Sequence, residues 1–369
     1  MPSQIDPIRR WCPRALRTGV LVALAGGVLV LGGCAGWGED EAAGPEGTIE
    51  APQATVAPEA TRPARGDRAA DAQRRFEEGQ RLAESGDIEA ALAQLERAIA
   101  INPSLTPAYI AAGDIYRERR DLPRAEERYR RATELDPSNF DALNRHALVL
   151  QLMGRLDEAV RGYLRALAVR PDDFEANLNT GAAYARLGEP RQAVIYAARA
   201  VELNPRSGAA RINLGAVYAA LDRHEDAVIE YQQAAELVDE PTPKLLVSLA
   251  DSLGRTGRYA EMVATLDQLV ARTPTAQAYE RLGAGLFRLR RYDRSLEAFE
   301  AAVELDSEHF PALNGVAVCL LNRYLWSEGQ DGESLERAVD TLRASLRVKP
   351  NQPRIVELVR RYGPRAGAG

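Results

Sequence analysis

A pattern of small and aromatic residues recurs along this chain at an interval of 34 residues. It reads AEERYRRATELDP from residue 125, AVRGYLRALAVRP from residue 159 and AVIYAARAVELNP from residue 193. A fixed interval of this length indicates one packing unit that is repeated and stacked on its neighbours. The length of 369 residues therefore does not predict a number of compact globular domains.

The proline that closes each copy sets the register of the whole chain. Gly113 in the first half of a unit and Ala125 in the second are small, as two closely packed antiparallel helices require. Gly154 marks the left-handed end of a first helix, and Pro137 prevents a second helix from continuing. In this register the units begin near residues 72, 106, 140, 174, 208, 243, 276 and 310.

The second unit resembles the tetratricopeptide repeat (TPR). The resemblance covers about residues 72 to 352 and implies an all-α solenoid of about eight tandem helix-turn-helix repeats. In such a solenoid the first helix of every repeat lines an inner groove. The residues that carry the family pattern are Tyr109, Ala112, Gly113, Tyr116, Ala125, Tyr129, Ala132 and Pro137.

The end of the predicted solenoid, at 71–352, has two further features. Nine extra residues, LWSEGQDGE at 325–333, separate the two helices of the last repeat. We expect them to form a longer loop, with Trp326 covering the core at its base. Residues 353–369 contain the apolar spacing of a C-terminal capping helix, followed by a tail that should fray.

The N-terminus has the pattern of an export signal. Four arginines precede the apolar stretch TGVLVALAGGVLVLGGC at 18–34. LGGC, residues 31–34, resembles the lipobox of bacterial lipoproteins, which implies that residues 1–33 are removed and that Cys34 receives lipid. An uncleaved transmembrane anchor is the alternative. Both interpretations place the remaining chain outside the cytoplasm, and Ala35 after the cysteine favours the periplasmic face of the outer membrane in the lipoprotein family.

Residues 34–70 are rich in Ala, Pro, Glu and Gly and contain too little apolar surface to form a core. We interpret this segment as a flexible tether between the anchor and the solenoid.

Composition argues against several classes of function. The formal net charge is -6 and Lys occurs only at 244 and 349, so no basic patch for nucleic acid is predicted. Three distant cysteines without a CxxC pair predict neither a metal site nor a disulfide framework. His146, His224 and His309 fall in different repeats, and no nucleophile, phosphate loop or paired-acid motif accompanies them. The sequence therefore predicts neither an enzyme nor a cofactor.

The groove implied by the family resemblance is the expected binding site. Asn side chains can pair with a partner's backbone amides, and Arg can hold carboxylates through two hydrogen bonds. We expect an adaptor in the bacterial envelope that binds another envelope protein or peptide and helps assemble a pilus, a secretion pore or a polysaccharide exporter. Binding of a polysaccharide or peptidoglycan fragment is the alternative. The predicted groove residues are Arg145, Asn179, Arg186, Asn213, Lys244 and Arg281.

Overall fold

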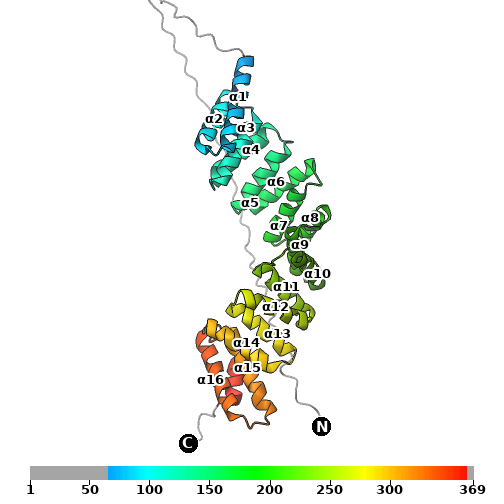
Figure 1. The fold of residues 1–369 in the computed structure, drawn as a ribbon, viewed down its shortest axis with the longest axis vertical. Helices are drawn as coiled ribbons and strands as arrows, with labels where there is room; N and C mark the ends of the chain where they lie inside the picture. Colours follow the sequence, from blue (N-terminus) through cyan, green and yellow to red (C-terminus); the bar gives the residue numbers. More distant parts are fainter. Residues whose placement is uncertain (1–64, 364–369) are drawn as a thin grey trace, which may run out of the picture. The chain divides into compact units, whose positions relative to one another are not determined.

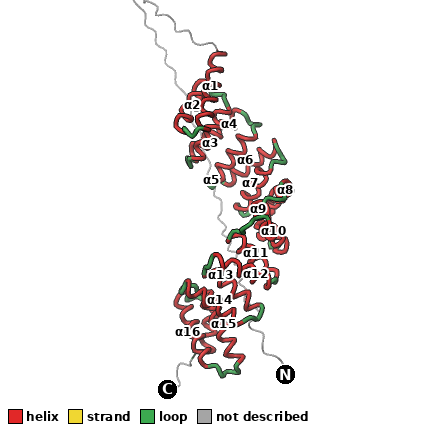
Figure 2. Tube along the Cα trace, in the orientation of Figure 1, coloured by secondary structure: helices red, strands yellow, loops and turns green. Residues whose placement is uncertain are grey.

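The computed structural model describes residues 65–363, which contain seventeen α-helices and no strand (Figures 1 and 2). The predicted all-α solenoid with a capping helix is confirmed. Cys34, the segment 1–33 and nearly all of the predicted tether lie outside the described residues. Within 65–363, no helix combines the length and the apolar character that crossing a membrane requires.

Each repeat is a pair of antiparallel helices, and the pairs follow one another in chain order (Figure 1). The odd-numbered helices up to α15 are first helices, the even-numbered helices are second helices, and α17 packs on α16 as the last element. The helices are α1 (Arg65–Glu84), α2 (Ile88–Ile101), α3 (Thr106–Glu118), α4 (Leu122–Leu135), α5 (Phe140–Leu152), α6 (Leu156–Val169), α7 (Phe174–Arg186), α8 (Pro190–Leu203), α9 (Gly208–Ala220), α10 (His224–Glu236), α11 (Pro243–Thr256), α12 (Tyr259–Arg272), α13 (Ala276–Arg288), α14 (Tyr292–Leu305), α15 (Phe310–Trp326), α16 (Gly332–Val348) and α17 (Pro353–Tyr362).

Helix ends follow local chemistry. The Asp173 carboxylate accepts a 2.8 Å hydrogen bond from the Ala176 amide and so caps the start of α7. Gly154 follows a first helix with φ of +79°, as the sequence predicts, and Gly188 has φ of +78° at the same place in its repeat. Arg120 takes the same conformation with φ of +63° although its side chain disfavours it.

Small residues let the two helices of a repeat approach each other. A Cβ atom on Gly113 would lie 2.7 Å from the Tyr129 ring, and one on Gly181 would lie 3.0 Å from the Ala197 backbone nitrogen. Ala125 is completely buried at the same contact. The predicted reason for the small residues is therefore confirmed.

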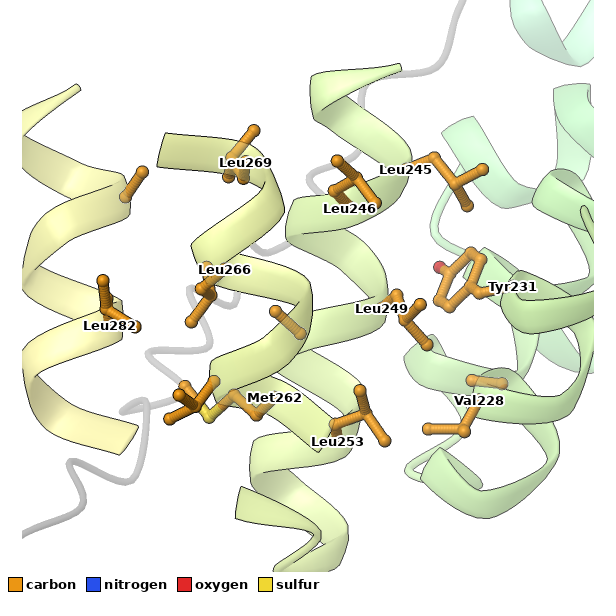
Figure 3. Close-up of a cluster of buried hydrophobic side chains, with 14 of the residues drawn as sticks. Val228, Tyr231, Leu245, Leu246, Leu249, Leu253, Met262, Leu266, Leu269 and Leu282 are labelled. Atoms are coloured by element: carbon orange, nitrogen blue, oxygen red, sulfur yellow. The ribbon is translucent and has the colours of Figure 1, made fainter. Parts of the chain in front are cut away.

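The sixth repeat, α11 and α12, uses larger side chains. Met262 stands where the second repeat has Ala125, and leucines fill the surrounding core (Figure 3). The Met262 sulfur lies 3.0 Å from the position of a Cβ on Gly254 and 3.5 Å from that on Gly285. Two glycines on neighbouring first helices therefore provide the room that Met262 needs.

The last repeat differs from the prediction. The extra residues lengthen the helices, because α15 and α16 have 17 residues each whereas α13 has 13. Only residues 327–331 separate α15 from α16, so the long loop predicted for 325–333 is wrong. Trp326 is 70% exposed, so it does not cover the core. It instead ends a helix that continues past the point where other first helices stop.

Contacts between non-consecutive helices identify the inner side of the stack. The first helices α3, α5, α7 and α9 each touch the next first helix directly, and α13 touches α15. Second helices within 65–363 pack mainly on the first helices before and after them. The side on which the first helices converge is therefore the concave side of the stack.

Candidate functional site

Two columns of side chains run along the converging first helices. We call the surface that they form the inner face. One column is the sixth residue of each helix from α5 to α13, and the other is the ninth residue of each helix from α3 to α11. The first column contains Arg145, Asn179, Asn213, Ser248 and Arg281, and the second contains Asp114, Leu148, Ala182, Ala216 and Asp251.

An arginine–aspartate pair joins neighbouring first helices at each end of the inner face. Arg145 on α5 donates to the Asp114 carboxylate on α3, which also accepts a 2.7 Å hydrogen bond from the Tyr129 hydroxyl. Arg281 on α13 holds Asp251 on α11, with Nε 2.8 Å from Oδ1 and Nη2 3.1 Å from Oδ2. Both arginines were predicted to hold a partner's carboxylate, and the structure pairs each with a carboxylate of this chain.

Burial perturbs the charged groups of these pairs. It lowers the pKa of Arg145 and raises the pKa of Asp251, because the charged form of each loses contact with water. Within each pair, the charge of one residue therefore stabilises the charge of the other. We infer that the primary role of both pairs is to hold adjacent repeats together.

The centre of the inner face carries no such pairs. Asn179 and Asn213 are half-buried, and their side chains make no hydrogen bond with any other described residue. The neighbouring Ala182 and Ala216 leave space above the helices. The two amides are therefore placed to pair with a ligand's polar groups.

The other two predicted groove residues lie at helix ends. Arg186, in the last turn of α7, donates a long 3.5 Å hydrogen bond to the Gln151 carbonyl oxygen on α5. Lys244, in the first turn of α11, is exposed and has no hydrogen bond or ion pair within the described chain.

A hollow of about 430 Å³ opens beside the Asp251–Arg281 pair, where α9, α10, α11 and α13 meet. Its polar lining includes His224, Tyr231, Ser248 and Arg255. The Tyr231 ring is buried, which raises the pKa of its hydroxyl. We call this hollow the α11 pocket.

Sequence reasoning missed Arg255. Arg255 is the thirteenth residue of α11, and Arg186 and Arg288 occupy the same place in α7 and α13. The 34-residue register would therefore have placed Arg255 on the inner face. Its guanidinium group has no hydrogen bond or ion pair with any residue of 65–363.

The reactive side chains in the described part of the chain are held in structural contacts. His146 Nε2 lies 3.2 Å from Glu126 Oε1, and burial lowers the pKa of this histidine. Cys319 is buried 3.4 Å from the Ser295 hydroxyl, and burial raises its pKa to about 11, which suppresses the reactive thiolate. Between residues 65 and 363, no group of three or more His, Cys, Asp or Glu side chains is arranged to hold a metal ion.

Two family models match the chain. One, described as TPR repeat, matches residues 113–154 and 152–188. The other, described as Tetratricopeptide repeat, matches residues 181–240, 247–309 and 285–353. Together they cover more than half of the sequence. No curated protein matches the chain.

Solved structures with helical repeats also resemble it. A tetratricopeptide repeat protein from Parabacteroides merdae is 18% identical with a TM-score of 0.48, over 68% of this chain and 99% of that chain. PilF of Pseudomonas aeruginosa is 20% identical with a TM-score of 0.48, over 56% and 94%. PilW, a type IV pilus biogenesis factor, is 21% identical with a TM-score of 0.48, over 55% and 94%.

Proposed function

Because this chain belongs to the tetratricopeptide repeat family, whose members mediate protein–protein interactions, we propose that it is a non-enzymatic adaptor that binds a partner protein or peptide on its inner face. The observation that carries the proposal is the centre of that face. Asn179 and Asn213 have no hydrogen-bond partner within the described chain and stand beside small alanines.

This arrangement suits an extended peptide. A peptide in extended conformation leaves backbone N–H and C=O groups free, and an Asn side chain can donate to one and accept from the other. Ala182 and Ala216 leave room for the peptide backbone to approach the helices. Such contacts recognise the backbone, so selectivity for one partner must come from the neighbouring side chains.

The N-terminal sequence extends the proposal to the cell envelope. Lipid on Cys34 would fix the chain to the periplasmic face of the outer membrane, and residues 34–70 would let the solenoid search around the anchor. Confinement near the membrane raises the effective concentration of the solenoid for a neighbouring partner. We therefore propose a role in assembling an envelope machine such as a pilus, a secretion pore or a polysaccharide exporter.

The test is photocrosslinking in cells, with a photoreactive residue placed at Asn213 in the full chain. The matched control carries the same residue at Ile229, which is 49% exposed on the second helix α10. One dominant protein adduct at Asn213 and not at Ile229 is the expected result. Identical adducts at both sites, or none at Asn213, would show that the inner face is not the working surface.

The envelope part of the proposal has its own test. Metabolic labelling with a fatty-acid analogue should modify the full chain and should not modify a Cys34→Ser variant. Labelling that survives this substitution would exclude lipidation at Cys34.

One observation favours the second candidate, binding of a polysaccharide or peptidoglycan fragment. The exposed Trp326 ring lies edge to face with Tyr292 at a centroid distance of 5.2 Å, and exposed aromatic rings commonly support sugars. Adding soluble peptidoglycan fragments should then shift the tryptophan fluorescence of a Trp11→Phe/Trp37→Phe chain, in which Trp326 is the remaining tryptophan. An unchanged spectrum at saturating sugar would reject this candidate.

A further inference from the structure

The C-terminal end of the solenoid carries a local excess of positive charge. Residues 341–363, which comprise the C-terminal part of α16 and the helix α17, contain six basic residues and one acidic residue, Glu357. The formal net charge of -6 for the whole chain conceals this excess. We call this surface, at the red end of the ribbon in Figure 1, the basic cap. Its six basic residues, all of them exposed, are Arg343, Arg347, Lys349, Arg354, Arg360 and Arg361.

We propose that the basic cap binds the anionic phospholipid headgroups of a membrane surface. The inference rests on the envelope part of the proposed function, because lipid on Cys34 would bring the solenoid to a membrane. It adds a second membrane contact, which uses none of the residues of the inner face. This contact would hold the last repeats close to the membrane.

Solubility alone does not require the excess of one sign. A terminal helix of a repeat stack needs a polar outer face, and charges of either sign provide one. The helix α1, at the opposite end of the stack, contains five basic and five acidic residues. The helix α17 contains three arginines and one glutamate in half that length. The sign of the charge on the basic cap therefore needs a separate explanation.

The ends of the helices do not supply that explanation. Arg347 lies in the last turn of α16, and Arg360 and Arg361 lie in the last turn of α17, where the helix dipole favours a cation. The second helices α2, α4, α6, α8, α10 and α14 nevertheless have no basic residue in the last turn. The repeat architecture therefore does not require a cation at these positions.

Acidic residues of the chain compensate only part of the charge. Asp340 pairs with Arg343 at 3.1 Å, and both side chains are exposed, so this pair is weak. The guanidinium groups of Arg347 and Arg360 make no ion pair or hydrogen bond with any residue of 65–363. Glu357 alone cannot balance the remaining cations. The basic cap therefore presents positive charge to its surroundings.

The composition of the basic cap suits lipid headgroups. A guanidinium group can hold two phosphate oxygens at once, and lipid phosphates move laterally, so each can meet a cation without a fixed spacing. Val348 and Val356 are 40% and 47% exposed among the cations and can enter the headgroup layer. Clusters of about four to eight basic residues on an amphipathic helix are typical of surfaces that bind anionic lipids.

The test is photocrosslinking to lipid, with the full chain reconstituted in vesicles. A photoreactive residue replaces Val356 on α17, and the matched control carries it at Ile229 on α10. One set of vesicles is phosphatidylcholine, and the other contains roughly one quarter of the anionic phosphatidylglycerol. We expect phosphatidylglycerol adducts at Val356 and not at Ile229. High salt should reduce them, because it screens the attraction between exposed charges.

The decisive variant is Arg347→Gln/Arg360→Gln, which removes two cations that have no partner in the described chain. The matched control is Arg161→Gln/Arg191→Gln, an equal change of charge on the exposed surfaces of α6 and α8. The yield of phosphatidylglycerol adducts at Val356 should fall about 10-fold in the first variant, because each basic residue near an anionic surface adds to the attraction. The control should keep the parent yield. Circular dichroism would verify that both variants fold.

The remaining outcomes would overturn the inference. Equal adducts with the two lipids at Val356, equal lipid adducts at Val356 and Ile229, or adducts that survive Arg347→Gln/Arg360→Gln would show that the basic cap does not select anionic lipid. So would a chain that fails to float with the phosphatidylglycerol vesicles. A dominant protein adduct at Val356 in cells would assign the cap to an acidic protein instead. Fatty-acid labelling of Cys34 and crosslinking at Asn213 test the proposed function separately, so its failure is distinguishable from that of the basic cap.

Discussion

Asp251 on α11 and Arg281 on α13 form a two-point ion pair between successive repeats, with distances of 2.8 and 3.1 Å. Asp114 and Arg145 form the corresponding pair between α3 and α5. In both pairs the aspartate is the ninth residue of one first helix and the arginine is the sixth residue of the next. The repeats between them have Asn, Ser, Ala and Leu at these places, which leaves the centre of the inner face open to a ligand.

The Asp251–Arg281 pair should contribute to stability. Arg281→Met would remove the guanidinium group, which is only 22% exposed, and leave Asp251 without its two hydrogen bonds, so we expect a loss of about 1 kcal/mol in the free energy of unfolding. The control Arg294→Met breaks an exposed pair to Asp267 and should cost less than about 0.5 kcal/mol. Urea denaturation measures both, and equal losses would show that the inner pair has no special role.

Gly113 should be irreplaceable in the second repeat. An alanine there would place its Cβ 2.7 Å from the buried Tyr129 ring, and we expect overpacking to cost about 1–3 kcal/mol. Gly66 is the control because a Cβ there meets nothing within 4 Å. Thermal denaturation of Gly113→Ala and Gly66→Ala compares the two sites. If Gly113→Ala is as stable as Gly66→Ala, the close helix contact is not what requires glycine.

Backbone conformation predicts substitutions of opposite effect at the ends of two first helices. Gly188→Ala should lower the free energy of unfolding by about 1 kcal/mol, because φ is +78° and a side chain disfavours this conformation. A Cβ there meets no other atom, so the backbone conformation alone accounts for the loss. Arg120→Gly relieves the same strain where φ is +63° and should not lower the melting temperature. A drop for Arg120→Gly comparable to that for Gly188→Ala would mean that the Arg120 side chain contributes more than its strain costs.

Acid should destabilise the α4–α5 contact through His146. Burial lowers its pKa in the folded chain below the ordinary value, although Glu126 opposes the shift. The unfolded chain therefore binds the proton more tightly, so stability is full above the unfolded pKa of about 6.5 and is lost as pH falls from there through the folded pKa. His146→Gln should lose less stability than the parent between pH 7.5 and pH 5. Parallel losses in the two chains would assign the acid sensitivity to other groups.

The repeat fold could be predicted from single residues because its causes are local and recurrent. Gly113 and Ala125 are small because two helices pack closely there, and the same requirement recurs in other repeats. Gly154 can be recognised in the sequence as the glycine that ends a first helix in the left-handed conformation. The loop predicted for 325–333 is wrong because the family pattern suggests a loop there, whereas CLLNRYLW, residues 319–326, contains no Gly or Pro that would end the helix before Ser327.

The candidate site depended on longer-range information. Arg145 and Arg281 were placed on the correct helices, but their pairing with Asp114 and Asp251 joins residues about one repeat apart and follows only when the columns of neighbouring helices are compared. The α11 pocket arises where four helices meet. Its volume depends on how the side chains of those helices pack, and spacing along the chain does not reveal that.

Met262 and its two facing glycines provide the last prediction. Met262→Ala would restore the small residue that Ala125 provides in the second repeat, but here it should destabilise by about 2–5 kcal/mol. The methionine is buried against Gly254 and Gly285, so its removal leaves a cavity between α11, α12 and α13. Adding Gly254→Ala to Met262→Ala should recover part of the loss, whereas Gly254→Ala alone should destabilise because its Cβ would meet the Met262 sulfur at 3.0 Å. A double-mutant cycle by urea denaturation measures this coupling. Simple additivity of the two single effects would show that Gly254 and Met262 were not selected as a matched pair.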